Sequence, residues 1–214
     1  MKILVDICIL SLVLTNFRLL ASSRLGALIQ TTILQAVFLS ALMLFKSEGP
    51  LSVYIVLLSL ITFTVKGIVL PWLLKRAMRS ADVQREIEPI IGYSASVLIG
   101  VVLLGLSFII FIPMKMSVSL ESGFLLPGAL FTTLTGLLMI ISRKNALTQV
   151  VGYLVMENGI YAFGILLAVE EPLLVEMGVL LDVFVAVFVM GITVYQISRT
   201  FDHIDTDRLS ELKD

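Results

Sequence analysis

Seven apolar runs divide this chain, and each is long enough to cross a lipid bilayer as an α-helix. A spanning helix needs about 20 mostly apolar residues, because the hydrocarbon core of a bilayer is about 30 Å thick. The runs cover residues 3–22, 26–45, 51–74, 91–113, 123–142, 146–169 and 172–198. We therefore predict an all-α, polytopic membrane protein with about seven transmembrane helices. We expect the first run to be a helix of the bundle rather than a cleaved signal peptide.

The composition agrees with this fold and bears on function. Hydrophobic residues make up 58% of the chain and charged residues 14%, whereas soluble domains average about 25% charged residues. The net charge of −1 gives no support to nucleic-acid binding. Cys8 and His203 are the only cysteine and histidine, too few to assemble a redox metal cluster. We expect no metal and no cofactor on this chain, so that any electron transfer takes place on another polypeptide.

The basic residues between the runs predict the orientation. Following alternate loops, one side collects 11 Lys and Arg residues, and the other has only Lys2, Lys46 and Lys115. Cytoplasmic loops carry the excess of Lys and Arg. We therefore predict that the N-terminus faces out and that the C-terminal tail, residues 202–214, lies on the cytoplasmic side.

Glu157 lies near the middle of the run 146–169. A carboxylate at that depth costs roughly 2.5–3.5 kcal/mol on insertion scales, so it persists when it is paired, protonated or facing water inside a bundle. Burial and a nearby cation act on a carboxyl proton in opposite directions, which suits a proton relay. Asn158, Gly152 and Tyr161 lie beside Glu157 or near its helix face and are supporting candidates. The alternative is a carboxylate held in a fixed hydrogen bond for packing.

Two further ionisable residues lie at spanning depth. Asp182 sits in the run 172–198 among apolar neighbours, so its partner must come from another helix. Lys66, in the third run, is the only intramembrane cation and could bias the charge of such carboxylates. The alternative is a buried ion pair of Lys66 with Asp182 or Glu157 that only holds helices together. Glu176 lies nearer the outer interface, where a solvated role and a functional role are equally compatible with the sequence.

Weaker polar signals occur in the second and fifth runs. Both runs carry polar side chains that could form hydrogen bonds between helices or line a wet path, and we expect the first of these roles. They are Gln30, Thr31, Thr32 and Gln35 in the second run and Thr132, Thr133 and Thr135 in the fifth. The segment 23–30 also matches 142–149 at five of eight positions. Residues 1–120 would then hold four N-terminal helices, the first three a degenerate repeat of the last three, and residues 121–214 a three-helix unit with a cytoplasmic tail.

Several short motifs in the last three runs resemble a known family. They are Gly136-Leu137-Leu138, Arg143-Lys144-Asn145-Ala146-Leu147, Gly152, Asn158, and the tail segments Ile204-Asp205 and Leu209-Ser210-Glu211-Leu212-Lys213. This part of the chain is similar to subunit K of respiratory complex I and to the related C-type subunit of multisubunit cation/proton antiporters. The whole chain resembles component E of hydrogenase-4 and formate hydrogenlyase-type complexes.

The resemblance implies a non-catalytic membrane-arm subunit of a proton-translocating, membrane-bound nickel–iron hydrogenase in a prokaryotic inner membrane. Its implied partners are antiporter-like and other hydrogenase membrane subunits, with the peripheral arm contacted only indirectly. The alternatives are a subunit of a cation/proton antiporter without redox chemistry, and a structural scaffold. The family pattern places its acidic residues at the positions of Leu154 and Val187, whereas Glu157 and Asp182 are the nearest acids here.

Overall fold

The computed structural model describes residues 2–46, 53–80, 89–115, 123–167, 181–182, 184–189 and 191. Its elements are α1 (Lys2–Ala21), α2 (Leu25–Lys46), α3 (Val53–Phe63), the π-helix η1 (Thr64–Val69), α4 (Leu70–Ser80), α5 (Tyr93–Lys115), α6 (Leu125–Ser142) and α7 (Ala146–Leu167). The described residues between 181 and 191 are helical as well. The all-α prediction is therefore confirmed.

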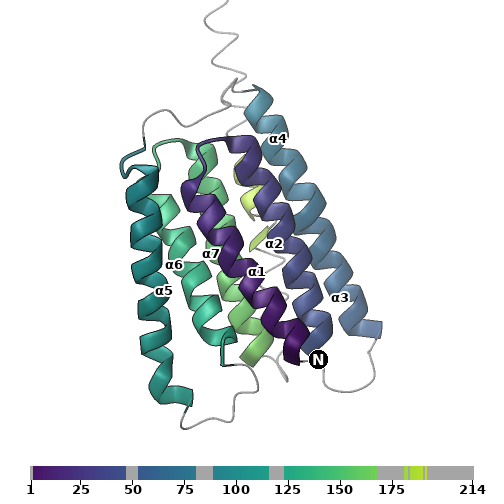
Figure 1. Ribbon diagram of the computed structural model, residues 1–214. Coiled ribbons are helices and arrows are strands. Elements are labelled where there is room, and N and C mark those ends of the chain that lie inside the picture. The colour runs from purple at the N-terminus through teal and green to yellow at the C-terminus, as the bar shows by residue number, and fades with distance from the viewer. Residues whose placement is uncertain are drawn as a thin grey trace, which may run out of the picture.

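Within the described residues, five helices have the length and apolar character needed to cross a membrane: Ile3–Ala21, Leu25–Phe45, Ile55–Arg79, Tyr93–Phe111 and Leu125–Ser142. The third of these joins α3, η1 and α4 into one helix. α7 is not among the five. It nevertheless runs beside α6 in the same bundle (Figure 1). Most of the seventh predicted helix, 172–198, lies outside the described residues.

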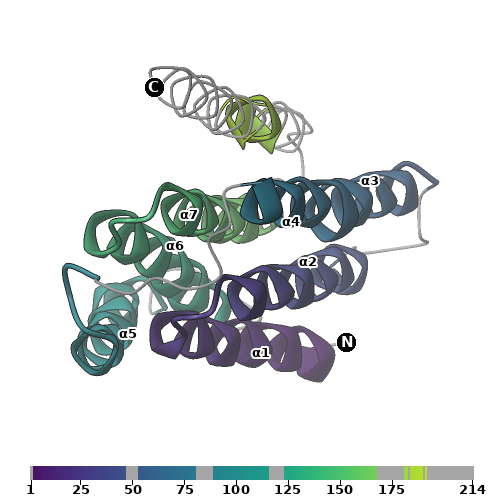
Figure 2. The ribbon, with the colours of Figure 1, turned by 90° about the horizontal axis from the view of Figure 1, so that it is seen from above.

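The helices pack so that α2 and α7 occupy the middle of the bundle. α2 contacts α1, α3, η1, α4 and α7, whereas α5 packs mainly against α1 and α6. Seen from above, α5 lies at one edge beside α6, and the rod of α3 and α4 lies beside α2 and α7 (Figure 2). Helices from both ends of the chain therefore meet around α7, where Glu157 is the twelfth of 22 residues.

Glycines allow α6 and α7 to approach closely, and this pair makes the most extensive helix contact in the bundle. A Cβ added at Gly136 would lie 2.5 Å from the carbonyl oxygen of Gly152 and 2.5 Å from the Cα of Met156. A Cβ at Gly159 would lie 2.8 Å from the carbonyl oxygen of Ala129. Small residues at helix crossings let backbones touch in membranes, where dispersion contacts replace the hydrophobic effect as the driving force.

Arg143, in the turn between α6 and α7, is buried, whereas the sequence predicted it to be one of the charged residues of the loops. Arg143 ends α6 in an extended conformation and is only 1% exposed. Its Nη2 donates to the carbonyl oxygen of Leu20 at 3.0 Å, and its guanidinium stacks over the ring of Tyr93 at 4.4 Å. Asn145 then begins α7, because its side-chain oxygen accepts a hydrogen bond from the backbone N–H of Leu147 at 2.9 Å. This turn therefore joins the ends of α1, α5 and α6.

The third membrane helix changes its hydrogen-bond register at its centre. The backbone N–H of Leu70 donates to the carbonyl oxygen of Val65, five residues earlier. Pro71 follows directly, and it has no N–H to give to the carbonyl of Gly67. Prolines and π-bulges disturb the α-helical ladder in this way, and π-bulges often lie at functional sites. The helix then continues to Ser80, beyond the end of the apolar run 51–74.

The orientation of the bundle stays a prediction that cysteine labelling can check. We expect Arg24→Cys, an exposed position in the α1–α2 turn, to resist a membrane-impermeant maleimide in intact cells. Gly123→Cys, just before α6, should react. The basic residues are in excess on the opposite side of the membrane, which is therefore cytoplasmic and leaves Gly123 on the outer side. Both variants carry Cys8→Ser, and permeabilised cells provide the control. The reverse labelling pattern would show the opposite topology.

Candidate functional site

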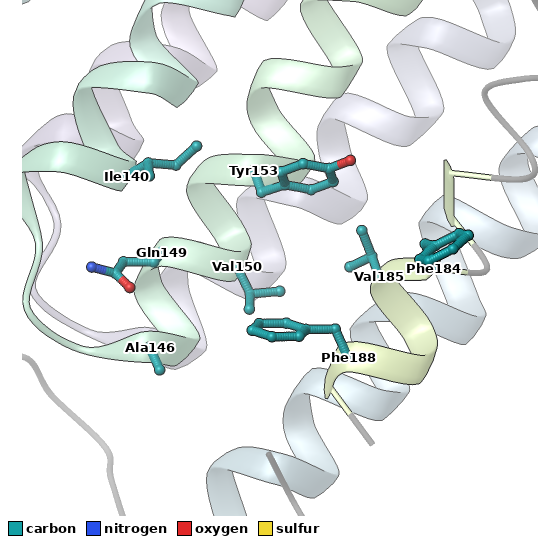
Figure 3. A pocket seen from close by; sticks show the side chains of 8 residues that line it. All are labelled: Ile140, Ala146, Gln149, Val150, Tyr153, Phe184, Val185 and Phe188. Atoms are coloured by element: carbon teal, nitrogen blue, oxygen red, sulfur yellow. The ribbon is translucent and has the colours of Figure 1, made fainter. Parts of the chain in front are cut away.

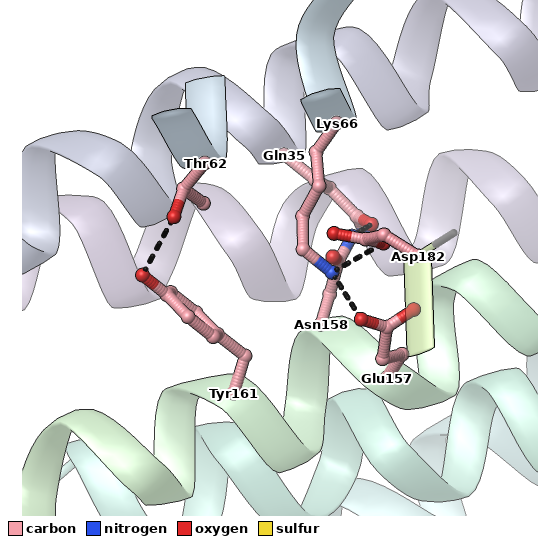
Figure 4. A network of polar contacts seen from close by, with 7 residues as sticks. All are labelled: Gln35, Thr62, Lys66, Glu157, Asn158, Tyr161 and Asp182. Atoms are coloured by element: carbon pink, nitrogen blue, oxygen red, sulfur yellow. Dashed lines mark hydrogen bonds and ion pairs between the residues drawn. The ribbon is translucent and has the colours of Figure 1, made fainter. Parts of the chain in front are cut away.

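The three intramembrane charges singled out from the sequence meet in one buried cluster, here called the charged triad. The Nζ of Lys66 donates a hydrogen bond to Oε1 of Glu157 at 2.6 Å. It also lies 3.2 Å from Oδ1 of Asp182, an ion pair that lacks the angles of a hydrogen bond. Lys66 is 6%, Glu157 2% and Asp182 1% exposed. Figure 4 shows the lysine reaching from its helix to both carboxylates.

Three helical segments that are far apart in sequence supply the charged triad. Lys66 lies in η1, Glu157 lies in α7, and Asp182 lies in the described helical residues beyond α7. The sequence left open whether Lys66 pairs with Glu157 or with Asp182, and the structure brings it to both. The partner that Asp182 lacks on its own helix therefore comes from the third membrane helix.

The charged triad carries an unbalanced charge when all three groups are ionised. One ammonium faces two carboxylates, and the net charge is −1. Oε2 of Glu157 is also buried, and it accepts no hydrogen bond from the described part of the chain. A charge that is neither in water nor fully paired is expensive in a low-dielectric interior. A single added proton would make the cluster neutral.

Tyr161 lies next to the lysine of the charged triad. Its ring centroid lies 5.7 Å from the Nζ of Lys66, within the range of a cation–π contact. Its hydroxyl is 3.1 Å from Oγ1 of Thr62 and 3.2 Å from Sδ of Met43. Tyr161 therefore links α7 to α2 and α3 one turn beyond Glu157, as Figure 4 shows for Thr62.

A chain of amide hydrogen bonds begins at Asn158, directly next to Glu157. Nδ2 of Asn158 donates to Oε1 of Gln35 at 3.0 Å, and Nε2 of Gln35 donates to Oδ1 of Asn16 at 2.7 Å. Nδ2 of Asn16 then donates to Oγ1 of Thr132 at 2.8 Å. We call these four residues the amide chain; it crosses the bundle through α7, α2, α1 and α6.

The sequence predicted part of this arrangement. Gln35 and Thr132 do form the hydrogen bonds between helices expected of them. Thr31, Thr32 and Thr133 instead donate to carbonyl oxygens of their own helices. Asn16 was not singled out, although an amide inside an apolar run was a signal that could have found it. Gly152 packs against α6, where an added Cβ would lie 2.9 Å from Cβ of Met139. Glu176 lies outside the described residues.

An open apolar cavity of about 360 Å³ lies beside the charged triad. Residues of α6, α7 and the segment 184–188 line it, among them Ile140, Tyr153 and Phe188 (Figure 3). Tyr153 precedes Glu157 by one helical turn, so the cavity reaches the level just before the cluster. Within the described ranges, no group of three His, Cys, Asp or Glu residues is placed to hold a metal ion.

Comparisons with known proteins show the family of this chain. Residues 124–214 match the family model for NADH-ubiquinone/plastoquinone oxidoreductase chain 4L. The uncharacterized protein Rv0085 of Mycobacterium tuberculosis is 33% identical over 217 aligned residues, covering 100% of this chain and 97% of that protein. Hydrogenase-4 component E of Escherichia coli is 30% identical over 184 residues, covering 86% of this chain and 83% of that protein. The chain belongs to the hydrogenase-4 component E family. No solved structure matches.

Membership of the component E family bears on localisation and assembly. The family match and the apolar helices place this component E relative in the inner membrane as a multi-pass protein. They also place it among the membrane subunits of hydrogenase- and complex I-type assemblies.

The structure also shows where this component E relative has its acidic residues and where the positions lie at which the resemblance implies them. Leu154, where that pattern has a glutamate, is 5% exposed and packs in the apolar core, whereas Val187 is 66% exposed. Glu157 and Asp182 instead point toward Lys66 (Figure 4). The two carboxylates therefore lie beside the ammonium of Lys66, which the π-helix carries.

Proposed function

We propose that this chain is a non-catalytic membrane-arm subunit of a proton-translocating, membrane-bound nickel–iron hydrogenase complex, and that the charged triad is part of its proton path. The observation that carries the proposal is the pairing of Lys66 with two buried carboxylates. An ion pair that served only to hold helices together would need one carboxylate. The second one gives the cluster a place for a proton.

The geometry suggests how a proton would pass. When a proton arrives on Glu157, that carboxyl becomes neutral, and the ammonium of Lys66 is left to pair with Asp182. When the proton leaves, the 2.6 Å contact of Lys66 with Glu157 forms again. Lysine suits this exchange because its ammonium is a compact charge on a flexible four-carbon stem. The ammonium would move between two carboxylates that it already contacts.

The proposal extends to the organisation and partners of the chain. Residues 121–214 would form the three-helix unit that resembles subunit K, and residues 1–120 would form the added helices that supply Lys66. A cluster that takes up and releases protons needs neighbouring groups to exchange them with. We propose antiporter-like subunits as these neighbours, on the basis of the match to the oxidoreductase family model.

Two substitutions in the assembled complex test the proton path. Glu157→Gln and Asp182→Asn keep the shape of each side chain but remove the protonatable carboxylate. We expect each to lower hydrogenase-driven proton uptake into inverted vesicles by about 10²-fold or more, the low end of the rate contribution of a positioned proton-transfer group. Hydrogenase activity with an artificial electron acceptor should be retained.

The control is Ser107→Ala, which removes a buried hydroxyl that bonds only to its own helix, at the carbonyl of Leu103. Proton uptake at the wild-type level in both Glu157→Gln and Asp182→Asn would exclude the proton-path role. Loss of the assembled complex, with normal uptake per remaining complex, would identify the cluster as a scaffold. Copurification with antiporter subunits alone, without nickel and iron–sulfur proteins, would favour the cation/proton antiporter.

A further inference from the structure

The amide chain has a single direction from end to end. Asn158 donates to Gln35, Gln35 donates to Asn16, and Asn16 donates to Thr132. The hydroxyl of Thr132 in turn donates to the carbonyl oxygen of Gly128 in its own helix at 2.7 Å. Gln35 and Asn16 each use the NH₂ group toward one neighbour and the oxygen toward the other. Turning one amide over would place two donors or two acceptors against each other, so the orientation of every member depends on the rest.

The amide chain is sealed from its surroundings. Gln35 and Asn16 are fully buried, and Thr132 and Asn158 are 1% and 3% exposed. Gln35 also donates to Oγ1 of Thr15 at 3.2 Å. A buried polar group that loses its partner keeps its full desolvation penalty, so these bonds resist breaking. Gln35 is the central member, since it bonds to α7 on one side and to α1 on the other.

The place where the amide chain meets α7 gives it a mechanical role. Asn158 follows Glu157 directly, so a bond that holds Asn158 also sets the rotation of α7 at Glu157. Gly159 packs against α6 on another face of α7, where an added Cβ would meet Thr133. With these two contacts, α7 can turn only if it breaks a buried hydrogen bond or separates from α6.

We propose that Gln35 is a positioning residue of the charged triad: by holding Asn158, it keeps Glu157 against the ammonium of Lys66. The N-terminal helices α1 and α2 would thus act on the site at a distance, although they contribute none of its charges. The inference rests on the proposed function only in taking Glu157 as the group that exchanges a proton. Whether Lys66 and Glu157 stay paired is a separate question from whether the complex translocates protons.

The test measures how readily Glu157 reacts with dicyclohexylcarbodiimide, which modifies protonated carboxyl groups in apolar surroundings. The purified complex is treated at one fixed pH, and modification of the Glu157 peptide is followed by mass spectrometry. Gln35→Met keeps the length of the side chain and removes its hydrogen bonds. We expect it to raise the modification rate by about threefold or more, the low end of coupling within one hydrogen-bond network.

Two variants set the limits of this measurement. Thr31→Val removes a buried hydroxyl on the same helix that bonds only to its own backbone, at the carbonyl of Ala27, and should leave the rate unchanged. Lys66→Met removes the cation and should give the highest rate. Adding Gln35→Met to Lys66→Met should then have no further effect, since the residue acts through the ion pair.

A rate for Gln35→Met equal to that of wild type would overturn the proposal. So would an unchanged rate in Lys66→Met, because Lys66 would then not control the proton on Glu157. If Gln35→Met does not assemble, Asn158→Ala takes its place, as it leaves Gln35 bonded to Asn16, and a wild-type rate there is equally decisive. None of these rates depends on proton translocation, so failure of the proposed function gives a different result.

Discussion

Alanine in place of Gly136 is expected to destabilise the protein severely, although it adds a single methyl group. The new Cβ would lie 2.5 Å from the oxygen of Gly152 and from the Cα of Met156, both backbone atoms of α7. Backbone atoms cannot move aside as a side chain does, so α6 and α7 would have to separate. Overpacking of this kind typically costs about 1–3 kcal/mol, and more where no relaxation is possible. Size-exclusion chromatography of the solubilised complex after heating should show a clearly lower midpoint.

Gly105→Ala in α5 is the matched control for this substitution. Gly105, like Gly136, lies in a membrane helix, but it is exposed, and a Cβ added there would meet nothing within 4 Å. Alanine is the better helix former by about 1 kcal/mol, so this control should be at least as stable as wild type. Equal stability of the two variants would show that α6 and α7 are not packed as closely as the structure has them.

Lys66→Met is expected to have the second large effect, because it leaves Glu157 and Asp182 facing each other without a cation. Removing one partner of a buried ion pair typically destabilises a protein by about 3–5 kcal/mol. A methionine fills nearly the same volume, so most of the effect would be electrostatic. We expect a lower heating midpoint and the loss of hydrogenase-driven proton uptake in vesicles.

The double variant Lys66→Met with Glu157→Gln separates charge from packing. It removes one of the two uncompensated carboxylates, so stability should return in part, while proton uptake should stay low. Lys75→Met, at an exposed lysine of α4, is the control for loss of a positive charge. If the double variant is no more stable than Lys66→Met alone, the instability does not come from the two carboxylates.

The candidate site was predicted from single residues, whereas its connections were not. Lys66, Glu157 and Asp182 could be found because a charge is rare and expensive in an apolar run. Their contacts join residues 91 and more positions apart, and no local pattern encodes such a distance. The burial of Arg143 also could not be predicted from the local sequence. It was expected among the loop charges, and its burial follows from the approach of α1 and α5.

The sequence was sufficient to predict the class of the protein, the approximate bounds of most of the described helices, and the residues that carry the buried charges. It could do so because a bilayer accepts only long apolar segments, and because each charged residue within one stands out. The length of the apolar run did not predict the end of α4 at Ser80, since a helix can continue past the apolar layer into polar sequence.

Which charges meet depends on how the helices pack. Gly136 and Gly159 bring α6 and α7 together, the π-helix before Pro71 carries Lys66, and the amide chain through Gln35 bonds to α7 next to Glu157. Each of these is a contact between helices, set by the shapes and hydrogen bonds of surfaces from distant parts of the chain. Lys66 therefore lies between two carboxylates because of how the bundle packs.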